Sequence, residues 1–581
     1  MDMVVTFLEH REVYDHPASL DELIALIRDL DATESAILLC QMNADFRLTK
    51  RDKDAVAKVQ QEIAGGLLSD KTISCLKERY GKVNMADRPV FHPVQLLNVL
   101  RLTTEHSTGV RSPLTDESAR YALGDACLMM SDLMLTDQER KAVASRDHES
   151  VMQSLMVQLL SPSELQNPAA IAHVAYRSRI MFHELLRNDA VLARISRQYK
   201  GFDFEREFSR VTNVGLSRWL FLLLAFHAYL MQYVGQDGVR HREFLAIDRL
   251  HFGEGTPIPQ AELDSVLTSV STKLDELRRA LRTTGLADWR FDSVPFRNKP
   301  FVELQPGKFY CTDLGFLAQK IHSGAYWAIH DGLTHAERFM LSGAWGILFE
   351  EYVNWFLGGR NFKDFKFWPV PKWDRCGESF DGALMKGSVF VPMEYKGGFL
   401  RREAKYSGSQ ALLEEELESK IVKGCKQLAR NIETLFHRRH ERRKSLRDIS
   451  TNHVTRVVPV LVFQDQILGG PLVNWWLNQR FNELLDRTAL RPGVTVDSLN
   501  VVGIREMETM AESAEAGDFD LFHGLQLKCY ADPEMRQNLH NFLLELPGYG
   551  KGKSSRILTV LDEQFSEITE YLFGKKRGLG G

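Results

Sequence analysis

The sequence predicts an α/β core, a mixed sheet flanked by helices, preceded by a large, mainly α-helical N-terminal domain. Apolar residues recur at helical spacing through most of residues 1–290, and helix-like and strand-like segments alternate through residues 331–512. The length of 581 residues also exceeds one hydrophobic core of ordinary size. We therefore expect domains at 1–290 and 331–512, a connecting hairpin and helix at 291–330, and a helical extension at 513–581.

The composition is that of a globular protein and limits where nucleic acid could bind. Hydrophobic residues make up 44% of the chain and the net charge is −4, so any contact with nucleic acid must come from local basic patches. The 7 cysteines are scattered without a Cys-x-x-Cys pair. That pattern favours a reducing compartment and argues against a cysteine zinc site.

The N-terminal segment and the most apolar run both predict a cytoplasmic protein without membrane contact. The first ten residues lack the basic region and the long apolar stretch of a secretory signal. The most apolar run, Trp219–Val234, contains His227 and Gln232 and is short for a bilayer crossing. We expect it to form a buried core helix.

Within residues 1–290 the sequence predicts helices but no catalytic motif. Ser19 and Glu22 form a capping-box pattern at the start of a helix that continues through Ile27. A helix over Gln260–Arg282 carries apolar residues at 3–4 spacing, which fits packing within its own domain or a dimer seam. We expect this region to serve sensing, regulation or oligomerisation.

A hairpin is predicted where the helical pattern of the sequence is interrupted. The sequence predicts two short strands around a Pro306-Gly307 turn, Lys299–Leu304 and Lys308–Cys311, and the helical pattern resumes at Asp313. We interpret this hairpin as the join between the N-terminal region and the domain that follows.

The segment from 331 to 512 alternates between helix and strand patterns. Helices are predicted over Arg338–Leu357, which presents Glu350 and Glu351, and over Ala411 to about Arg447. Between them a hairpin turns at Gly387-Ser388, and Val454–Phe463 reads as a strand buried on both faces. Further helix and strand patterns follow at Asn474–Leu485 and Val494–Ile504.

The hairpin at Gly387-Ser388 gathers acidic residues. Counting outward from a two-residue type II′ turn, Asp381 falls opposite Glu394 in a non-hydrogen-bonded pair, with Cα atoms roughly 4.5 Å apart. Lys396 lies on the same face as Glu394 because side chains alternate along a strand. Two facing carboxylates repel unless a cation lies between them, and oxygen ligands with open positions suit Mg²⁺ or Mn²⁺.

Asp381 followed by Glu394-Tyr395-Lys396 resembles the PD-(D/E)XK nuclease superfamily, and the order helix, hairpin, helix, strand resembles its restriction-endonuclease-like core. The resemblance implies that Asp381 and Glu394 hold a metal ion, that Glu350 adds another acidic ligand, and that Gln427 on the following helix belongs to the site. Two positions depart from the pattern: Phe380 stands where the family name has Pro, and Pro392 lies inside the Glu-x-Lys strand.

The resemblance implies a Mg²⁺- or Mn²⁺-dependent endonuclease that hydrolyses phosphodiester bonds, of DNA rather than RNA, in bacterial defence against phage or in DNA restriction. Lys396 would orient or deprotonate the attacking water, and Gln427 would position the water or Lys396. An activating partner protein and a homo-oligomer are further expectations. The candidate nucleic-acid-binding residues are Arg401, Arg402, Lys420, Lys423 and Arg430. The basic run His437–Lys444 could also grip phosphates, or could be a solvated helix end.

Two other interpretations stay open at this stage. Pro392 and Phe380 favour a protein that keeps the nuclease fold without cutting and acts as a nucleic-acid-binding or scaffold subunit. Alternatively, Asp381 is a polar strand residue that faces water, and Glu394 and Lys396 are a salt-bridging pair on a solvated strand. Metal titration and the effect of Glu394→Ala on activity distinguish these alternatives.

Overall fold

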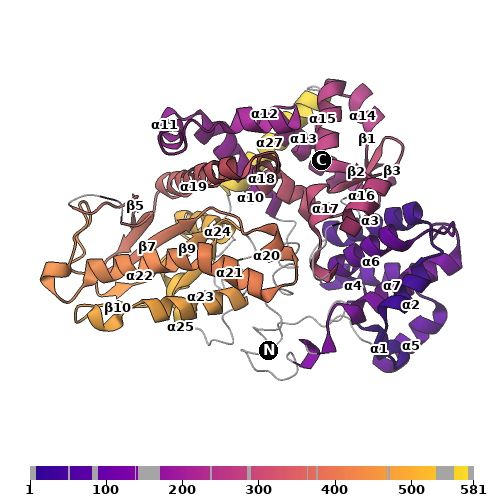
Figure 1. Ribbon diagram of the computed structural model, residues 1–581, viewed down its shortest axis with the longest axis horizontal. Coiled ribbons are helices and arrows are strands. Elements are labelled where there is room, and N and C mark those ends of the chain that lie inside the picture. Colours follow the sequence, from indigo (N-terminus) through magenta and orange to yellow (C-terminus); the bar gives the residue numbers. More distant parts are fainter. Residues whose placement is uncertain are drawn as a thin grey trace.

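The structure, a computed structural model, describes most of the chain as helices around two sheets (Figure 1). The described residues are 8–49, 53–80, 89–137, 139–141, 170–235, 238–283, 289–362, 364–374, 377, 379–465, 468, 471–530, 548 and 555–573. The coarse prediction is confirmed: a mixed sheet flanked by helices follows a large, mainly helical region. Of the predicted extension at 513–581, the segments 531–547, 549–554 and 574–581 lie outside the described residues.

The first helices build one core, coloured indigo and violet in Figure 1. The predicted capping box is confirmed, since the Glu22 backbone N–H donates to Ser19 Oγ at 3.2 Å and the Glu22 carboxylate accepts from the Ser19 backbone N–H. The helices are α1 (His10–Tyr14), α2 (Leu20–Ile27), α3 (Ala32–Leu48), α4 (Lys53–Leu67), α5 (Asp70–Tyr80), α6 (Pro93–His106) and α7 (Glu117–Leu133).

A second set of helices follows and includes the most apolar segment of the chain. This segment is α13 (Leu216–Leu230), whose side chains are mostly buried in the protein, as predicted. In the described ranges, no helix is by itself long and apolar enough for a membrane span; α12 with Leu216–Tyr233 reaches that length only as a pair bent by 62°. The other helices of this set are α10 (Ala170–Arg179), α11 (Asp189–Gln198), α12 (Phe204–Thr212) and α14 (Arg249–Glu254).

The predicted hairpin is present but belongs to a four-stranded sheet. Its strands β3 (Phe301–Gln305) and β4 (Lys308–Cys311) lie between β2 (Ser271–Lys273) and β1 (Ala246–Asp248), in the order β1-β4-β3-β2. Neither outer strand was predicted. Alternate hairpin residues pack into two different cores, Phe301 and Phe309 into one and Val302 and Tyr310 into the other.

The predicted helix over Gln260–Arg282 is wrong at its centre. It divides into α15 (Gln260–Val270) and α16 (Leu274–Thr283), with β2 between them. The backbone of β2 pairs in parallel with Phe301–Glu303, and this tertiary pairing replaces the helical hydrogen bonds. The continuous apolar seam that could have formed a dimer interface is therefore interrupted.

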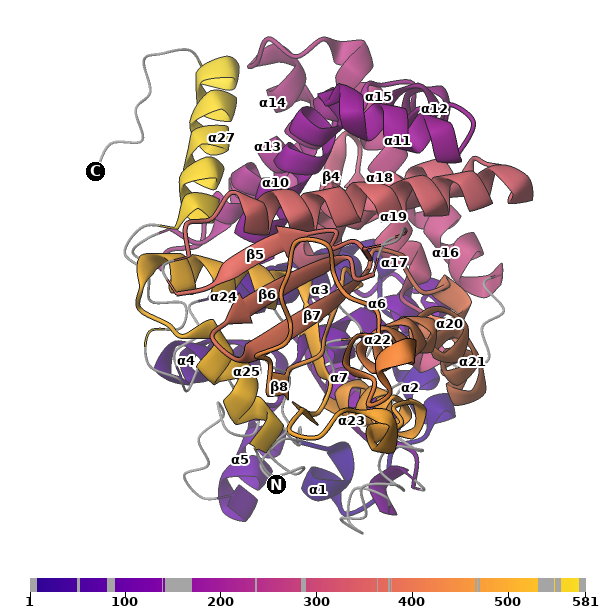
Figure 2. The same cartoon turned by 90° about the vertical axis from the view of Figure 1, so that its left-hand side faces the viewer.

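Two long helices connect the helical region to the larger sheet. Asp313 caps α18 (Leu314–Asp331) through its carboxylate and also accepts from Arg47 of α3 at 2.7 Å, so it ties the first core to the centre of the molecule. α19 (His335–Gly358) contains the predicted helix and lies across the sheet (Figure 2). The short α17 (Val294–Asn298) precedes the small sheet's hairpin.

The larger sheet is mixed, as predicted for the α/β core. Strands β10-β8-β7-β6-β5 follow one another, and β9 lies between β7 and β11. The hairpin β6-β7 and the β5-β6 pair are antiparallel, whereas β7, β9 and β11 run parallel. The bounds are β5 (Lys366–Pro369), β6 (Gly382–Lys386), β7 (Val389–Lys396), β8 (Arg456–Val457), β9 (Val460–Phe463), β10 (Thr495–Val496) and β11 (Asn500–Gly503).

Two prolines explain why the predicted strand over Val454–Phe463 is divided. β7 pairs with β8 as far as Phe390 and with β9 from Met393 onward, so its ladder is interrupted at Pro392. The partner chain is interrupted at the same level, at Val458 and Pro459. Pro392 therefore lies in a central strand at a place where no backbone donor is required.

Helices cover both faces of the larger sheet. α19 and α24 (Ile504–Ala516) cover one face, and α22 (Val422–Phe436) and α23 (Pro471–Leu484) cover the other (Figure 2). The predicted helix from Ala411 to about Arg447 is divided into α21 (Gln410–Lys420) and α22, and it ends at Phe436. The chain leaves the helix there because the Arg438 backbone N–H pairs with Ala489 O at 2.7 Å. The remaining helices are α20 (Arg402–Tyr406), α25 (Leu521–Tyr530) and α27 (Arg556–Phe573).

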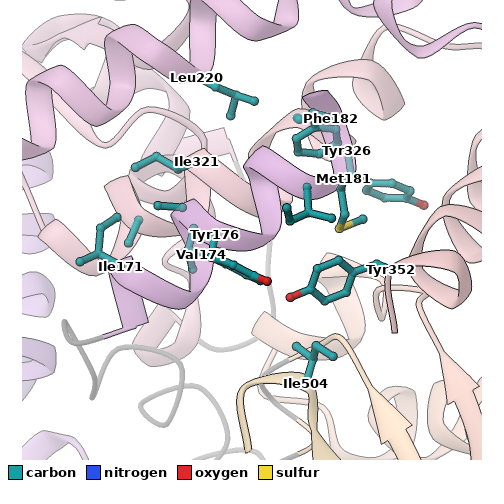
Figure 3. Packing of buried hydrophobic residues seen from close by; sticks show 14 of the residues in the cluster. Ile171, Val174, Tyr176, Met181, Phe182, Leu220, Ile321, Tyr326, Tyr352 and Ile504 are labelled. Atoms are coloured by element: carbon teal, nitrogen blue, oxygen red, sulfur yellow. The ribbon is translucent and has the colours of Figure 1, made fainter. Parts of the chain in front are cut away.

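The predicted domain boundaries do not separate hydrophobic cores. One cluster joins α10, α13, α18 and α19 to the inner face of the larger sheet and to α27. Figure 3 shows part of it, in which Ile171, Ile321, Tyr352 and Ile504 from four different helices converge. The boundaries at 290, 330 and 512 thus mark segments of sequence, and the segments on either side of 330 and 512 pack together.

Candidate functional site

The turn between β6 and β7 sets the position of the acidic residues. Gly387 has φ of 55° while Ser388 does not have positive φ, the pattern of the predicted type II′ turn. The register pairs Lys386 with Val389 and Gly382 with Met393. The predicted register is confirmed as far as the pair Gly382–Met393. β6 begins at Gly382, and the Asp381 backbone N–H also donates to Met393 O, so the regular ladder ends before the predicted pair of Asp381 with Glu394.

Asp381 directly precedes β6 and is hydrogen-bonded to β7. Its backbone N–H donates to Met393 O at 3.0 Å, and its carboxylate Oδ2 accepts from the Tyr395 backbone N–H at 2.7 Å. Two short contacts to one strand fix both the backbone and the side chain. The carboxylate therefore stays beside the strand that carries Glu394.

Glu394 is buried and carries a strongly perturbed carboxyl group. Its residue is only 3% exposed, and burial, together with the negative charge of Asp381, raises its pKa from 4.5 to about 7. Lys396 opposes this shift, because its Nζ donates to Glu394 Oε1 at 2.8 Å. A negative charge at Glu394 is thus costly in this structure and would be favoured by a nearby cation.

Lys396 connects the strand to the helix that covers it. Its Nζ also donates to Oε1 of Gln427 on α22 at 3.1 Å. The sequence placed Gln427 on the helix after the strand, and the structure brings it to Lys396. A single ammonium group therefore contacts both a carboxylate of β7 and an amide of α22.

Gly424, which the sequence analysis missed, allows this approach. A Cβ at Gly424 would lie 2.4 Å from Lys396 Cε, closer than real contacts allow, and 3.1 Å from Leu461 Cδ1, which is tight. Any other residue would displace the Lys396 side chain from its place between β7 and α22. A glycine inside a helix with otherwise regular apolar spacing was the available signal, because it often marks close packing.

The acidic residues Asp381 and Glu394 line a cavity of about 390 Å³. We call it the acidic cavity. Asp381, Glu394, Gln427 and Arg430, four of the predicted site residues, line it. The sequence did not predict its other lining residues, which are Trp373, Ser379, Phe380, Asn431, Thr434 and Lys444.

Glu350 does not complete a three-carboxylate group, contrary to expectation. Arg194 of α11 holds it, with Nη2 at 2.8 Å from Glu350 Oε2, and the same guanidinium donates to Glu351 Oε1 at 2.6 Å. Among the residues that the structure describes, no three His, Cys, Asp or Glu side chains are grouped to hold a metal ion. Glu350 still lies close enough to Glu394 that its charge raises the pKa of Glu394.

The predicted nucleic-acid-binding residues divide into two groups. Arg401 and Lys420 both pair with the buried carboxylate of Glu416, at 2.6 Å each, and Arg402 pairs with Asp331 at 2.8 Å. These three cations are therefore already engaged. Lys423 and Arg430 are exposed on α22, and no ion pair involves either of them within the described chain.

The basic run His437–Lys444 lies beyond the end of α22. Arg438, Arg439 and Arg442 are exposed, and Lys444 lines the acidic cavity with its Nζ 5.7 Å from the centre of the Trp373 ring. The run therefore adds positive charge at the side of the cavity where Arg430 lies.

Together these residues make a cavity lined by two carboxylates, an amide and two cations, and Lys396 is bonded to two of the lining residues, Glu394 and Gln427. Such a site can bind a divalent cation together with an anionic group. The comparisons add no relative to this geometry: no protein-family model, no curated protein and no solved structure matches the chain.

Proposed function

We propose that this protein is a metal-dependent nuclease of the PD-(D/E)XK type that hydrolyses phosphodiester bonds of DNA. The observation that carries the proposal is the convergence of Asp381, Glu394 and Gln427 on one cavity, with Lys396 bonded to the last two. The order of α19, the β6-β7 hairpin, α22 and β9 supports a restriction-endonuclease-like core.

The donor set fits Mg²⁺ or Mn²⁺. Mg²⁺ commonly keeps several waters and binds through one or two carboxylates together with substrate phosphate, so Asp381 and Glu394 suffice as protein ligands. The raised pKa of Glu394 supports this assignment, because a bound cation would remove the cost of ionising that buried carboxyl. When bound, the ion would supply the positive charge that acidifies water and offsets charge on phosphate oxygens.

The remaining residues have separate roles in this proposal. Lys396 would orient the attacking water as the ammonium or, as the neutral amine, accept its proton, and its second bond to Gln427 would hold the side chain in place. Arg430 and Lys444 would neutralise the phosphates of a strand that enters the acidic cavity. No basic field covers the whole chain, whose net charge is −4, so these local cations matter.

The biological setting we propose is bacterial defence or DNA restriction. The basis is the likeness to PD-(D/E)XK nucleases that carry a long non-catalytic region, which is an analogy of architecture. The helical region before residue 330 would then sense a target, bind an activating partner protein or form a homo-oligomer. Its shared core with the larger sheet offers a direct mechanical connection to the site.

The second candidate function is a catalytically inactive, nucleic-acid-binding or scaffold subunit. One observation favours it. Arg194 forms an ion pair with Glu350, the carboxylate that was expected as a third metal ligand. In that case the acidic cavity would be a structural remnant, and Lys396 would simply neutralise Glu394.

One experiment separates the two candidates. Purified protein is incubated with supercoiled and linear DNA in Mg²⁺ or Mn²⁺, beside Glu394→Ala, Lys396→Ala and an EDTA control. Glu403→Ala, which removes an exposed carboxylate from α20, is the matched control. Metal-dependent cutting that Glu403→Ala keeps and both site variants lose supports the nuclease. Undiminished DNA binding without cutting by any protein supports the scaffold.

A further inference from the structure

A second cavity lies between the helical region and the larger sheet, and it shares no lining residue with the acidic cavity. Its volume is about 80 Å³. We call it the cationic cavity, because Arg297, Lys320, Arg402 and Lys405 line it and Asp465 is the one carboxylate among its lining residues. These side chains come from α17, α18, α20 and the segment that follows β9.

Lys320 is the unusual member of this group. The residue is 8% exposed, and within the described chain its ammonium has no ion-pair partner. Gly324, one turn later on α18, gives room for its stem, since a Cβ there would lie 2.8 Å from Lys320 Cδ. Burial, aided by the positive charges of Arg402 and Lys299, lowers the pKa of Lys320 to about 7.

The nearby carboxylates are committed to other groups. Asp465 accepts from Lys405 Nζ at 2.9 Å and from the Leu400 backbone N–H at 2.9 Å. Asp331 accepts from Arg402 Nη1 at 2.8 Å. The charge of Lys320 is thus left without a dedicated counter-charge, an arrangement that costs stability unless a ligand supplies one.

Two guanidinium groups are held rigidly around the same space. Arg402 stacks on Trp327, with its Cζ 4.2 Å from the ring centre. Arg297 lies between the rings of Phe316 and Tyr406, at 4.7 and 4.4 Å, and donates to Gln319 Oε1 at 2.6 Å. Side chains fixed in this way lose little entropy when they bind an anion.

We infer that the cationic cavity is a binding site for a small oxyanion of the phosphate class, with Lys320 as its principal charge. The cavity volume of about 80 Å³ accommodates a few waters or one tetrahedral anion, since one water needs a cavity volume of roughly 10–15 Å³. A whole nucleoside does not fit. The ligand is therefore either free phosphate or the terminal phosphoryl group of a larger molecule that protrudes from the cavity.

The cavity borders the strands that carry the candidate active site. Gln464, which lines it, directly follows β9, and its backbone N–H donates to Lys396 O at 3.1 Å. Gln464 also contacts His322 of α18, with 2.5 Å between Nε2 and Nε2. An oxyanion here would lie beside Gln464 and Asp465, the two residues that directly follow β9.

The first test follows thermal unfolding of the full chain while inorganic phosphate replaces chloride at constant ionic strength. We expect a saturable rise in Tm for the wild type and for Lys308→Met, which changes an exposed lysine of β4. Lys320→Met should lose the saturable rise, with binding at least about tenfold weaker, since one charge-assisted bond is removed. An equal rise in wild type and Lys320→Met would show a general salt effect and overturn the proposal.

A second test needs no variant and uses sulfate, which does not titrate near neutral pH. An oxyanion stabilises the Lys320 ammonium, so at about pH 8 binding should take up close to one proton, measured by calorimetry in buffers of different ionisation enthalpy. Binding without proton uptake, or no binding, would contradict the assignment. The charged and titratable groups around Lys320 are Arg297, Lys299, Arg402, Lys405, Asp331, Asp465 and His322. Burial holds the pKa of His322 well below its ordinary value.

Adenosine monophosphate, tested against phosphate in the first assay, separates the two possible sources. Tighter binding of the nucleotide than of phosphate, lost in Lys320→Met, would identify a phosphoryl group on a larger molecule. Phosphate binding alone, also lost in Lys320→Met, would identify the free anion. Either result requires Lys320 and supports the site.

Discussion

Lys396 Nζ donates to Glu394 Oε1 across 2.8 Å, two residues apart on the same face of β7. This bond places the positive charge of the ammonium beside a carboxyl group whose pKa is raised by burial. The ammonium therefore occupies one oxygen of Glu394. If a cation held by Asp381 and Glu394 took this oxygen, Lys396 would keep its bond to Gln427.

Glu394 should make the protein less stable as pH rises from about 5 to about 7. Its pKa is about 7 when folded and 4.5 in the unfolded chain, so over that range the folded state holds a proton that the unfolded state has released. The free energy of unfolding falls across this window and levels off above it, by up to ~3 kcal/mol. Glu394→Gln removes the titration, so its Tm should exceed that of the wild type more at pH 8 than at pH 5.

Glu403→Gln, at an exposed position, serves as the control and should follow the wild type at both pH values. Addition of Mg²⁺ at about pH 8 should raise the Tm of the wild type but not that of Glu394→Gln. A Tm difference between Glu394→Gln and wild type that does not change with pH would show that the carboxyl does not titrate in this range.

Removal of Arg194 should strengthen metal binding at the acidic cavity. Arg194 neutralises Glu350, whose charge acts on Glu394, so Arg194→Met makes the site more negative. One unit charge near the site is worth about 1 kcal/mol, which corresponds to roughly fivefold tighter Mg²⁺ binding at pH 8 by calorimetry.

Arg187→Met, which changes an exposed arginine near the start of α11, should leave the affinity unchanged. The double variant Arg194→Met with Glu350→Gln should return to the wild-type value. Unchanged Mg²⁺ affinity in Arg194→Met would mean that Glu350 has no influence on the site.

Glu508 should be the most important single charge for stability of the larger core. Burial would raise its pKa, but Arg177, His173 and Tyr352 together hold the pKa below its ordinary value. Arg177 Nη1 lies 3.0 Å and Tyr352 Oη 2.6 Å from its carboxylate oxygens, so Glu508 joins α24 to α10 and α19.

Glu508→Ala leaves Arg177 buried and unpaired, and should destabilise the protein by about 3–5 kcal/mol. Tyr352→Phe, which removes one hydrogen bond, should cost about 1–3 kcal/mol. Glu563→Ala is the control: this carboxylate is 55% exposed and lies 4.0 Å from Arg179, so its loss should cost under about 1 kcal/mol. Urea unfolding measures all three, and equal effects of Glu508→Ala and Glu563→Ala would contradict the assignment.

Nucleic-acid binding should depend on Arg430 and Lys444 more than on Arg401. Arg430 and Lys444 are exposed and line the acidic cavity, whereas Glu416 and Glu415 already engage Arg401. Each of Arg430→Ala and Lys444→Ala should weaken DNA binding and lower the slope of log K against log salt by about 1.

The measurement is fluorescence anisotropy with labelled DNA over a range of salt concentrations, in EDTA so that no substrate is cut. Arg401→Ala is the matched control and should change neither affinity nor slope appreciably. If Arg401→Ala reduces the slope while Arg430→Ala and Lys444→Ala do not, the DNA lies along α20 and not beside Arg430 and Lys444 of the acidic cavity.

The local part of the site could be predicted from sequence. A two-residue turn with Gly387 first fixes the register of β6 and β7, and the period of two then places Glu394 and Lys396 on one face of β7. Gln427 could be assigned to the following helix for a similar reason, because helical spacing is also a short-range property.

The errors arose where distant segments compete with local preference. Apolar spacing over Gln260–Arg282 is helical, yet the chain at β2 pairs with Phe301–Glu303 and becomes a strand. Helix α22 could have continued past Phe436. The residues that follow pair with Ala489 and Leu490 instead, and this pairing ends the helix. Hydrogen bonds to remote backbone groups carry no signal in the local pattern.

The sequence by itself determined the acidic hairpin, most helix positions and the alternation of helix and strand in the second half of the chain. Only the tertiary structure decided that Arg194, 156 residues away from Glu350, engages it, and that Lys320 lies buried among other cations. The physical reason is that turn geometry and periodicity act over a few residues. Burial, ion pairing and cavity shape depend instead on which distant surfaces pack together.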